Sequence, residues 1–100
     1  MTSVVQHRVR TQDGITLAAE YYRRDGDRPV VLLVRGGGQD RHAWSTSARR
    51  LRSRGYSVVA YDTRGHGDSD WDPAGRYDVE RLATDLIAVR NHFSLDKPPA

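Results

Sequence analysis

Three consecutive glycines follow an apolar run and are the first residues of this sequence that could do chemistry. The run is VVLLV, residues Val30–Val34, and Arg35 separates it from Gly36, Gly37 and Gly38. Because glycine has no Cβ, its backbone can adopt unusual φ angles and approach a ligand closely. The segment therefore predicts a backbone pocket for a negative charge, with an ordinary tight turn between a strand and a helix as the alternative.

Phosphate is one candidate for that charge. A dinucleotide-binding loop of the form Gly-x-Gly-x-x-Gly needs a third glycine at position 41, which is Arg41, and no Gly-Lys-Ser or Gly-Lys-Thr occurs. A helix N-terminus flanked by Arg35 and Arg41 can still hold an anion. A small anion- or nucleotide-binding α/β module therefore stays open as an alternative function.

The sequence predicts no metal site and no other cofactor. The spacing of Asp68, Asp70 and Asp72 imitates the first ligands of a calcium loop. The sixth position of that loop is Pro73 and the twelfth is Val79, where a calcium loop requires glycine and glutamate. Cysteine is absent, which excludes disulfides and cysteine-ligated metals.

A hairpin is expected at the start of the chain. Residues 4–9 and 15–22 alternate apolar and polar side chains, as half-buried strands do. Between them lies Asp13-Gly14, a pair favoured in tight hairpin turns.

Two strand-then-helix units are expected to follow. Val30–Val34 is apolar at every position, which predicts a parallel strand covered on both faces, and residues 56–62 predict a second buried strand. The first helix contains Trp44 and ends near Gly55. The second begins after the N-cap Asp78. Its predicted apolar face consists of Val79, Leu82, Ala83, Leu86, Ile87 and Phe93.

The charge pattern favours neither nucleic acid nor a membrane. The net charge is +3, and fifteen of the sixteen basic residues are arginines scattered along the chain. The densest set lies outside the apolar arc of the first helix and has no interleaved aromatics, which predicts a solvated face. That set is Arg49, Arg50, Arg52 and Arg54. The N-terminus has no long apolar run, so we expect no signal peptide, no membrane span and a cytoplasmic protein.

Taken in order, these features resemble the N-terminal part of the α/β-hydrolase superfamily. The resemblance runs from about Val4 to Pro98 and is carried by RGGGQDRHAW, residues 35–44, and DTRGHGDS, residues 62–69. Small cofactor-free esterases, lipases and non-haem haloperoxidase-like members match best. The resemblance implies an α/β fold with an incomplete α/β-hydrolase-type sheet, in which an antiparallel β-hairpin precedes a β-α-β-α segment with parallel strands.

The resemblance also assigns roles to the two glycine-rich loops. In the family, backbone N–H groups just after the third strand form part of an oxyanion hole, which falls here on Gly36, Gly37 and Gly38. One such donor stabilises a transition state by about 3 to 4 kcal/mol. Arg35 stands where the family most often has histidine. The residues expected to frame the site are Arg35, Asp62, Arg64, Gly65, Gly67 and Ser69.

No catalytic residue is assigned, because the family's nucleophile is missing. An α/β-hydrolase needs a Gly-x-Ser-x-Gly turn followed by an acid and a histidine, and this sequence has no such turn. We expect residues 1–100 to be the N-terminal segment of an α/β-hydrolase domain that stops before that turn. The resemblance implies that the ancestral reaction is hydrolysis of an ester or related bond. We expect a small-molecule substrate to bind only when the part that carries the nucleophile completes the domain.

An absent fifth strand has a further consequence. Val30–Val34 would present a bare strand edge, for which we expect self-association. A subunit that completes its sheet with another chain is the remaining alternative.

Overall fold

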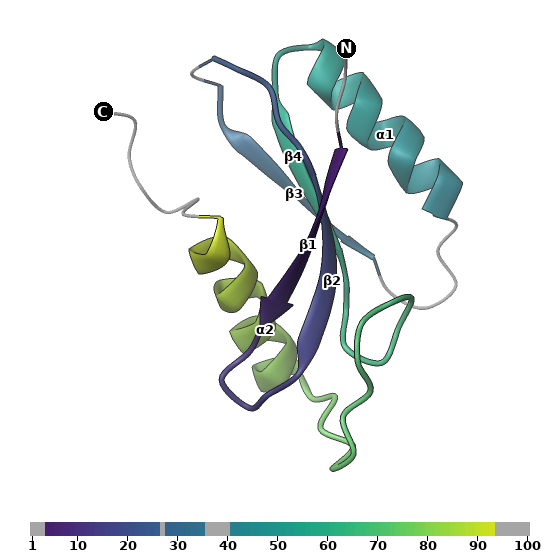
Figure 1. Cartoon of the computed structure of the whole chain (residues 1–100), viewed down its shortest axis with the longest axis vertical. Helices are drawn as coiled ribbons and strands as arrows, with labels where there is room; N and C mark the ends of the chain where they lie inside the picture. Colours follow the sequence, from purple (N-terminus) through teal and green to yellow (C-terminus); the bar gives the residue numbers. More distant parts are fainter. Residues whose placement is uncertain (1–3, 27, 36–40, 94–100) are drawn as a thin grey trace.

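The computed structural model describes residues 4–26, 28–35 and 41–93, with side chains from Trp44 onward in the first helix. Within this part of the chain four strands form one mixed sheet, and two helices pack against it (Figure 1). The predicted fold class and order of elements are confirmed. The strands are β1 (Val4–Arg10), β2 (Thr16–Tyr22), β3 (Val30–Arg35) and β4 (Ser57–Asp62), and the helices are α1 (Arg41–Ser53) and α2 (Val79–His92).

β1 and β2 form the predicted antiparallel hairpin. Val9 lies opposite Leu17, and both side chains are buried. Gly14 has a φ of 85°, the positive angle that its turn requires. Thr11 closes the turn, since its backbone N–H donates to the Ile15 carbonyl at 2.9 Å.

β4 lies inside the sheet, where the strand order is β1-β2-β4-β3. It pairs antiparallel with β2 and parallel with β3, and all six of its residues are buried. In the parallel pair Arg35 is the register partner of Asp62. The carboxyl ends of β3 and β4 therefore meet at one edge of the sheet, and the two glycine-rich segments begin side by side.

The helices cover opposite faces of the sheet. Because side chains alternate along a strand, neighbouring residues of β4 contribute to two separate apolar clusters. The cluster beneath α2 contains Val9, Leu17, Ala19, Val59, Tyr61 and Val89. The cluster beneath α1 contains Tyr22, Ala48, Val58 and Ala60.

The prediction that Val30–Val34 is covered on both faces holds in part. Val30 and Leu32 pack against one apolar cluster and Val31 and Leu33 against the other, each partly buried, whereas Val34 is 41% exposed. The reason is position, since β3 is at an edge of the sheet formed by the described residues and has β4 on one side alone. Its outer backbone groups face away from the sheet.

The predicted apolar face of α2 is wrong. Val79 is 81% exposed and Ile87 is 46% exposed, whereas Asp85 and Val89 are buried. Asp85 is drawn inward because it binds the buried guanidinium of Arg64. Part of the predicted face instead borders an open apolar depression of about 300 Å³ beside the β3 edge, whose lining includes Val34, Leu82, Ala83 and Leu86. Neither described helix has the length and apolar character needed to cross a membrane.

Candidate functional site

A buried ion cluster lies where β3 and β4 end. Arg35 is 4% exposed, and its Nη1 lies 2.5 Å from Oε1 of Glu20. Its Nε lies 2.8 Å from Oδ1 of Asp62. Glu20 comes from β2, so the cluster spans three adjacent strands on the face that α1 covers. Two carboxylates neutralise the arginine that stands where the resembled family most often has histidine.

The two contacts of Arg35 differ in kind. Nη1 donates a hydrogen bond to Glu20, whereas the Nε–H is not aligned with Asp62, so that contact is an ion pair without a hydrogen bond. Nη2 has no hydrogen-bond partner among the described residues. The Arg35 carbonyl accepts from the Thr63 N–H at 2.9 Å. These contacts fix the end of β3, from which the predicted oxyanion loop starts. Gly36, Gly37 and Gly38 themselves lie outside the described residues.

The loop after β4 folds back on the strand that it leaves. One Asp62 carboxylate oxygen accepts from the Asp68 N–H at 3.1 Å. The Ser69 hydroxyl donates to the Asp62 carbonyl at 2.6 Å and accepts from the Ala18 N–H at 2.8 Å. The Ser69 hydroxyl is therefore bonded to backbone on both sides, as suits a residue that frames a loop.

Gly65 and Gly67 permit this tight path. Their φ angles are +78° and +53°, in the left-handed region that disfavours side chains. A Cβ on Gly65 would come within 2.7 Å of the Tyr77 ring, and one on Gly67 would collide with the Asp62 carboxylate. Both positions thus require glycine for backbone angle and for space.

Gly67→Ala is expected to destabilise the fold more than Gly75→Ala does. Gly75 also has a positive φ, of 67°, but a Cβ there meets nothing within 4 Å. Gly75→Ala should lower the free energy of unfolding by about 1 to 2 kcal/mol. Gly67→Ala should lose about 1 to 3 kcal/mol more, because it displaces Asp62. Urea unfolding of both variants measures the difference, and equal losses would show that Asp62 does not hold the loop.

A second ion cluster ties this loop to the rest of the fold. Arg64 is 1% exposed, and its Nε and Nη2 bind the two carboxylate oxygens of Asp85 at 2.7 and 2.6 Å. Its Nη1 also lies 3.0 Å from oxygens of Asp13 and Asp72. Arg64 thereby joins the β1–β2 turn, the loop after β4 and α2.

The cluster shifts the titration of its members. The hydrogen bonds that Arg64 donates to Asp85 and Asp13 raise the pKa of Arg64 above its ordinary value. The hydrogen bond from Arg64 holds the pKa of Asp13 well below its usual range. Arg76, whose Nε lies 2.7 Å from Asp72, lowers the pKa of that carboxyl from 3.8 to about 2.

Acid should therefore weaken the fold in a defined pH window. Because the folded pKa of Asp72 is below its unfolded value, its contribution is fully present above about pH 4. That contribution is lost as the pH falls toward about 2. We expect the urea midpoint to fall across this window, and to fall less steeply in Asp72→Asn. An unchanged pH slope in that variant would contradict the assignment.

The His66 ring is held against the backbone of the loop. Its Nδ1 lies 2.9 Å from the Thr63 hydroxyl and 3.2 Å from the Arg64 carbonyl. The Thr63 hydroxyl also lies 3.3 Å from the Arg35 carbonyl, to which it donates. The tautomer consistent with both carbonyls has a proton on Nδ1, so the nitrogen that faces Thr63 is a donor.

Three acidic residues of these clusters were not anticipated. Glu20, Asp13 and Asp85 lie far from the glycine-rich motifs in sequence, and Asp13 was assigned to its turn alone. Asp85 carries a usable signal, because it lies between Leu82 and Ile87 on a helix that must bury one face. A charged residue at such a position calls for a buried partner.

Comparison with known proteins places this arrangement in one family. A sequence model described as alpha/beta hydrolase fold matches residues 29–98. The chain is 35% identical over 69 residues to 3-oxoadipate enol-lactonase 2 of Acinetobacter baylyi, which covers 69% of this chain and 25% of the lactonase.

Two solved structures share the fold. An esterase from Exiguobacterium antarcticum matches with a TM-score of 0.74 and 29% identity over 90% of this chain and 32% of its own. An epoxide hydrolase from Vigna radiata matches with a TM-score of 0.74 and 28% identity over 91% of this chain and 29% of its own. The chain thus spans about a quarter to a third of the length of each of these proteins.

Proposed function

This chain belongs to the alpha/beta hydrolase fold family, and on that premise we propose that it forms the part of a hydrolase that carries the oxyanion loop. The register of β3 and β4 supports the proposal, because it sets Arg35 and Asp62 side by side at the carboxyl edge of the sheet. Ligands of open α/β sheets bind at that edge. In the loop of Gly36, Gly37 and Gly38, the N–H groups of Gly37 and Gly38 would donate to the oxygen of a tetrahedral intermediate.

The proposed substrate class contains an ester or lactone bond. Attack on either gives a tetrahedral oxyanion, which is the species that a backbone donor stabilises. The names of the lactonase and the esterase agree with this class, whereas the named epoxide hydrolase acts on another bond. A module that binds nucleotides through the Gly36–Gly38 loop is not favoured, since the Arg35 guanidinium is engaged by Glu20 and Asp62.

Residues 1–100 alone are proposed to lack hydrolytic activity. In the described part of the chain Ser57 and Ser69 are buried and bonded to backbone, and the Ser53 hydroxyl donates to the Arg50 carbonyl. No described serine hydroxyl contacts His7, His66 or His92. An oxyanion hole without a nucleophile and a base has only a weak effect on the rate of hydrolysis.

The purified chain tests both proposals. It should neither hydrolyse p-nitrophenyl acetate above the rate of free imidazole nor react with a fluorophosphonate probe. A serine labelled by the probe, located by mass spectrometry, would overturn the claim of inactivity. The genomic reading frame after the codon for Ala100 tests the parent function, since it should encode an apolar strand and Gly-x-Ser-x-Gly.

Self-association of the isolated chain through β3 is also proposed. The outer edge of Val30–Val34 offers unpaired backbone groups, and such an edge is a template for another strand. Val34→Lys should lower the sedimentation coefficient at high protein concentration, because a lysine on the edge opposes pairing. Val5→Lys is the matched control, since Val5 is 51% exposed on β1 at the opposite edge. A monomer at every concentration would contradict the proposal.

A further inference from the structure

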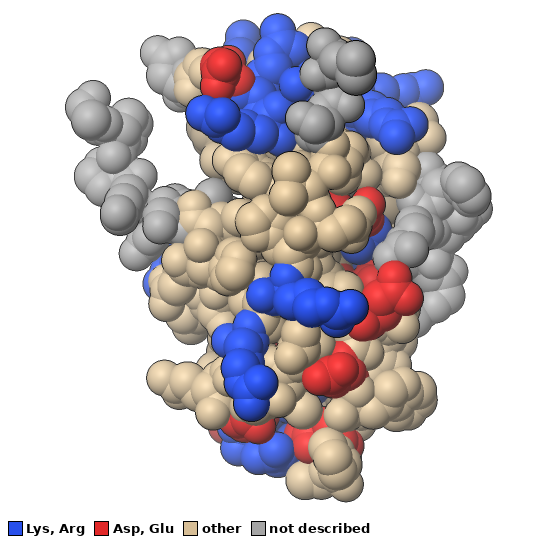
Figure 2. Space-filling view, viewed as in Figure 1, with Lys and Arg blue, Asp and Glu red and all other residues tan. Residues whose placement is uncertain are grey.

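Arginines gather at the end of the molecule remote from the candidate site. Figure 2 shows basic side chains concentrated where α1 ends and where the chain leaves β2. An open cavity of about 340 Å³ lies there, lined by Val4, Arg24, Arg49, Arg52 and Ser53. The cavity is at the amino ends of β3 and β4, whereas the candidate site is at their carboxyl ends. Among the described lining residues there is no carboxylate.

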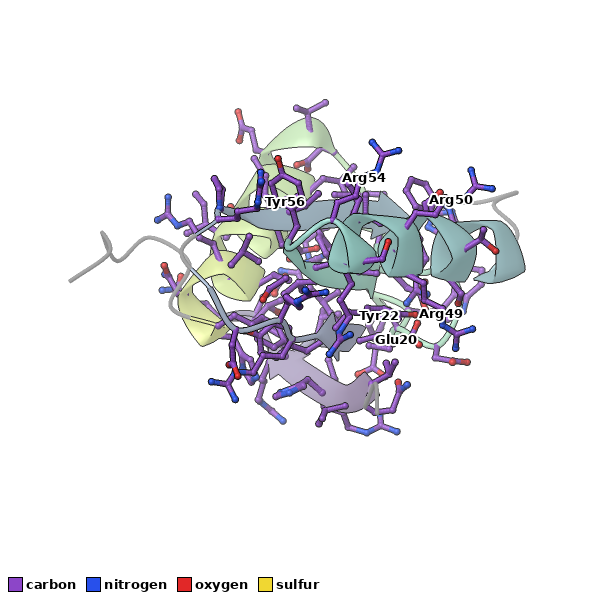
Figure 3. The ribbon with its side chains drawn as sticks, turned by 90° about the horizontal axis from the view of Figure 1, so that it is seen from above. Glu20, Tyr22, Arg49, Arg50, Arg54 and Tyr56 are labelled. Carbon is purple, nitrogen blue, oxygen red and sulfur yellow. The ribbon has the colours of Figure 1, made fainter. Side chains whose placement is uncertain are left out.

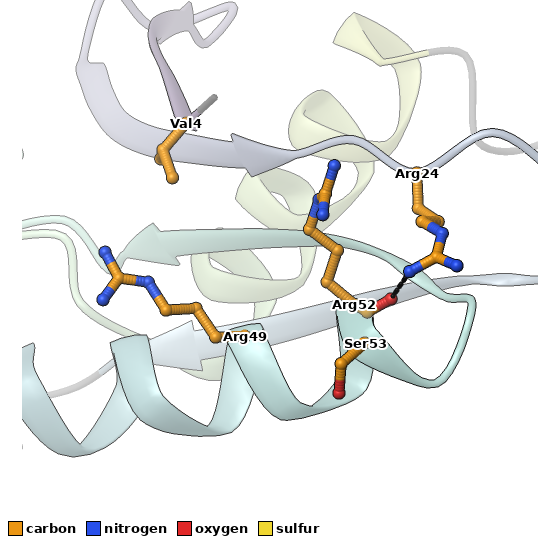
Figure 4. Close-up of a pocket in the computed structure, with 5 residues that line it drawn as sticks. All are labelled: Val4, Arg24, Arg49, Arg52 and Ser53. Atoms are coloured by element: carbon orange, nitrogen blue, oxygen red, sulfur yellow. Dashed lines mark hydrogen bonds between the residues drawn. The ribbon is translucent and has the colours of Figure 1, made fainter. Parts of the chain in front are cut away.

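Two of these arginines are held by the backbone across the cavity. Arg24 Nη1 donates to the Arg52 carbonyl at 2.9 Å (Figure 4). Arg52 Nε donates to the Arg23 carbonyl at 2.8 Å. The buried Ser57 hydroxyl accepts from the Arg24 N–H at 2.7 Å and donates to its carbonyl at 2.9 Å. The segment after β2 and the last turn of α1 are thus fixed relative to each other, which lowers the entropy lost on binding.

The side chain of Arg49 is not held by bonds of this kind. In the part of the chain that the structure describes it has neither an ion-pair nor a hydrogen-bond partner, although it lines the same cavity as Arg24 and Arg52. It lies on the side of α1 toward Tyr22, whereas Arg50 and Arg54 point to the other side (Figure 3). Three guanidinium groups around one cavity repel one another unless an anion lies between them.

The carbonyl groups at the C-terminal end of α1 do not repel an anion in this cavity. The last carbonyls of a helix carry partial negative charge. In α1 the Leu51 carbonyl accepts from the N–H groups of Arg54 and Tyr56, and the Arg52 carbonyl accepts from Gly55 and Arg24. The Arg50 carbonyl accepts from the Ser53 hydroxyl at 2.7 Å. These three carbonyls are engaged, and the charged side chains that line the cavity are all donors.

We propose that this cavity binds the phosphate group of a small molecule, with Arg49 as its principal ligand and Arg24 and Arg52 beside it. Guanidinium groups match phosphate oxygens in geometry and charge. The volume is at the lower end of the range for small-molecule sites and exceeds the need of one phosphate group. Val4 and the apolar stems of the arginines can contact the rest of an organic phosphate. Nucleic acid fits less well, since the basic set has no interleaved aromatics.

Calorimetric titration of the chain with inorganic phosphate and with phenyl phosphate tests the site. Saturable binding of one phosphate per chain is expected, weakened about tenfold in Arg49→Gln, the loss of one charged hydrogen-bonding partner. Arg50→Gln is the matched control, because it removes the same charge from the next position of α1 outside the cavity. It should change the dissociation constant less than about twofold, since salt screens the distant charge.

One further variant and a comparison of the two ligands test the proposal more closely. Arg49→Lys keeps the charge and loses the planar fork, so its affinity should lie between wild type and Arg49→Gln. Tighter binding of phenyl phosphate would identify an organic phosphate as the ligand, and equal binding would identify free phosphate. Equal weakening by Arg49→Gln and Arg50→Gln would overturn the proposal. Binding of an RNA oligonucleotide that phosphate does not displace, or no saturable binding of phosphate, would overturn it as well.

Discussion

Arg64→Met is expected to lower the free energy of unfolding by about 3 to 5 kcal/mol. The methionine leaves Asp85 buried without a cation. Asp72, whose side chain is fully buried, loses Arg64 and retains Arg76 as its ion-pair partner. Breaking a buried ion pair from one side costs this much because the remaining charge has lost both water and its partner. Since a domain of this size is stable by only about 5 to 15 kcal/mol, this loss removes a large share of its stability.

Urea unfolding followed by circular dichroism measures the loss. Arg64→Lys should retain part of the stability, because an ammonium group keeps the charge but cannot bind both oxygens of Asp85. Arg81→Met serves as the control, since Arg81 is 40% exposed and lies 3.7 Å from Asp13. It should change stability by less than about 1 kcal/mol. A loss for Arg64→Met no larger than that of Arg81→Met would contradict the anchoring role.

The Arg64 cluster joins three parts of the fold. Arg64 links Asp13 of the hairpin turn to Asp85 of α2 across the loop that follows β4. The loop is therefore held near its start by the bonds to Asp62 and farther along by the contact of Asp72 with Arg64. A rigid loop at the carboxyl edge of the sheet supports precise placement of groups around a substrate.

Local patterns in the sequence were enough to predict the helices, the strands and the turns between them. The Asp13-Gly14 pair, the glycine at position 55 and the N-cap at Asp78 mark turns and helix ends by short-range chemistry, which a sequence displays directly. Asp78 does accept from the Arg81 N–H at 2.8 Å, as an N-cap should. The parallel pairing of β3 with β4 follows from the helix between them.

The burial of individual side chains could not be predicted from local patterns. An apolar pattern shows that Val34 and Val79 suit an interior, but whether a neighbour covers them depends on strand order. Because β3 is at an edge of the described sheet, both side chains remain exposed. The apolar stripe of α2 fits a covering element beside β3 better than it fits the sheet that is present.

The ion clusters were hidden for a related reason. Glu20 is 15 positions from Arg35, and Asp85 is 21 positions from Arg64. Such pairs meet only after β2 has paired with β4 and α2 has packed on the hairpin. The sequence marks Arg35 as a departure from the resembled pattern, yet it contains no local signal for the acid that accepts it.

Arg35→Met is expected to lower the free energy of unfolding by about 3 kcal/mol or more, because it leaves Glu20 and Asp62 close together without their buried cation. Two carboxylates in one buried site repel each other, which adds to the loss. Urea unfolding measures the loss. Arg23→Met is the control, since Arg23 pairs with Asp25 where both side chains are more than 70% exposed, and it should change little.

A double-mutant cycle separates the loss of the cation from the loss of packing. Glu20→Gln removes one of the two charges that Arg35 neutralises, so in the Arg35→Met background it should restore about 1 kcal/mol or more. If it restores nothing, the arginine acts by volume alone. If it restores stability, the end of β3 is held by charge balance across three strands. A histidine at position 35 would then be too short to replace both contacts, and the end of β3 in this chain depends on its own acid pair.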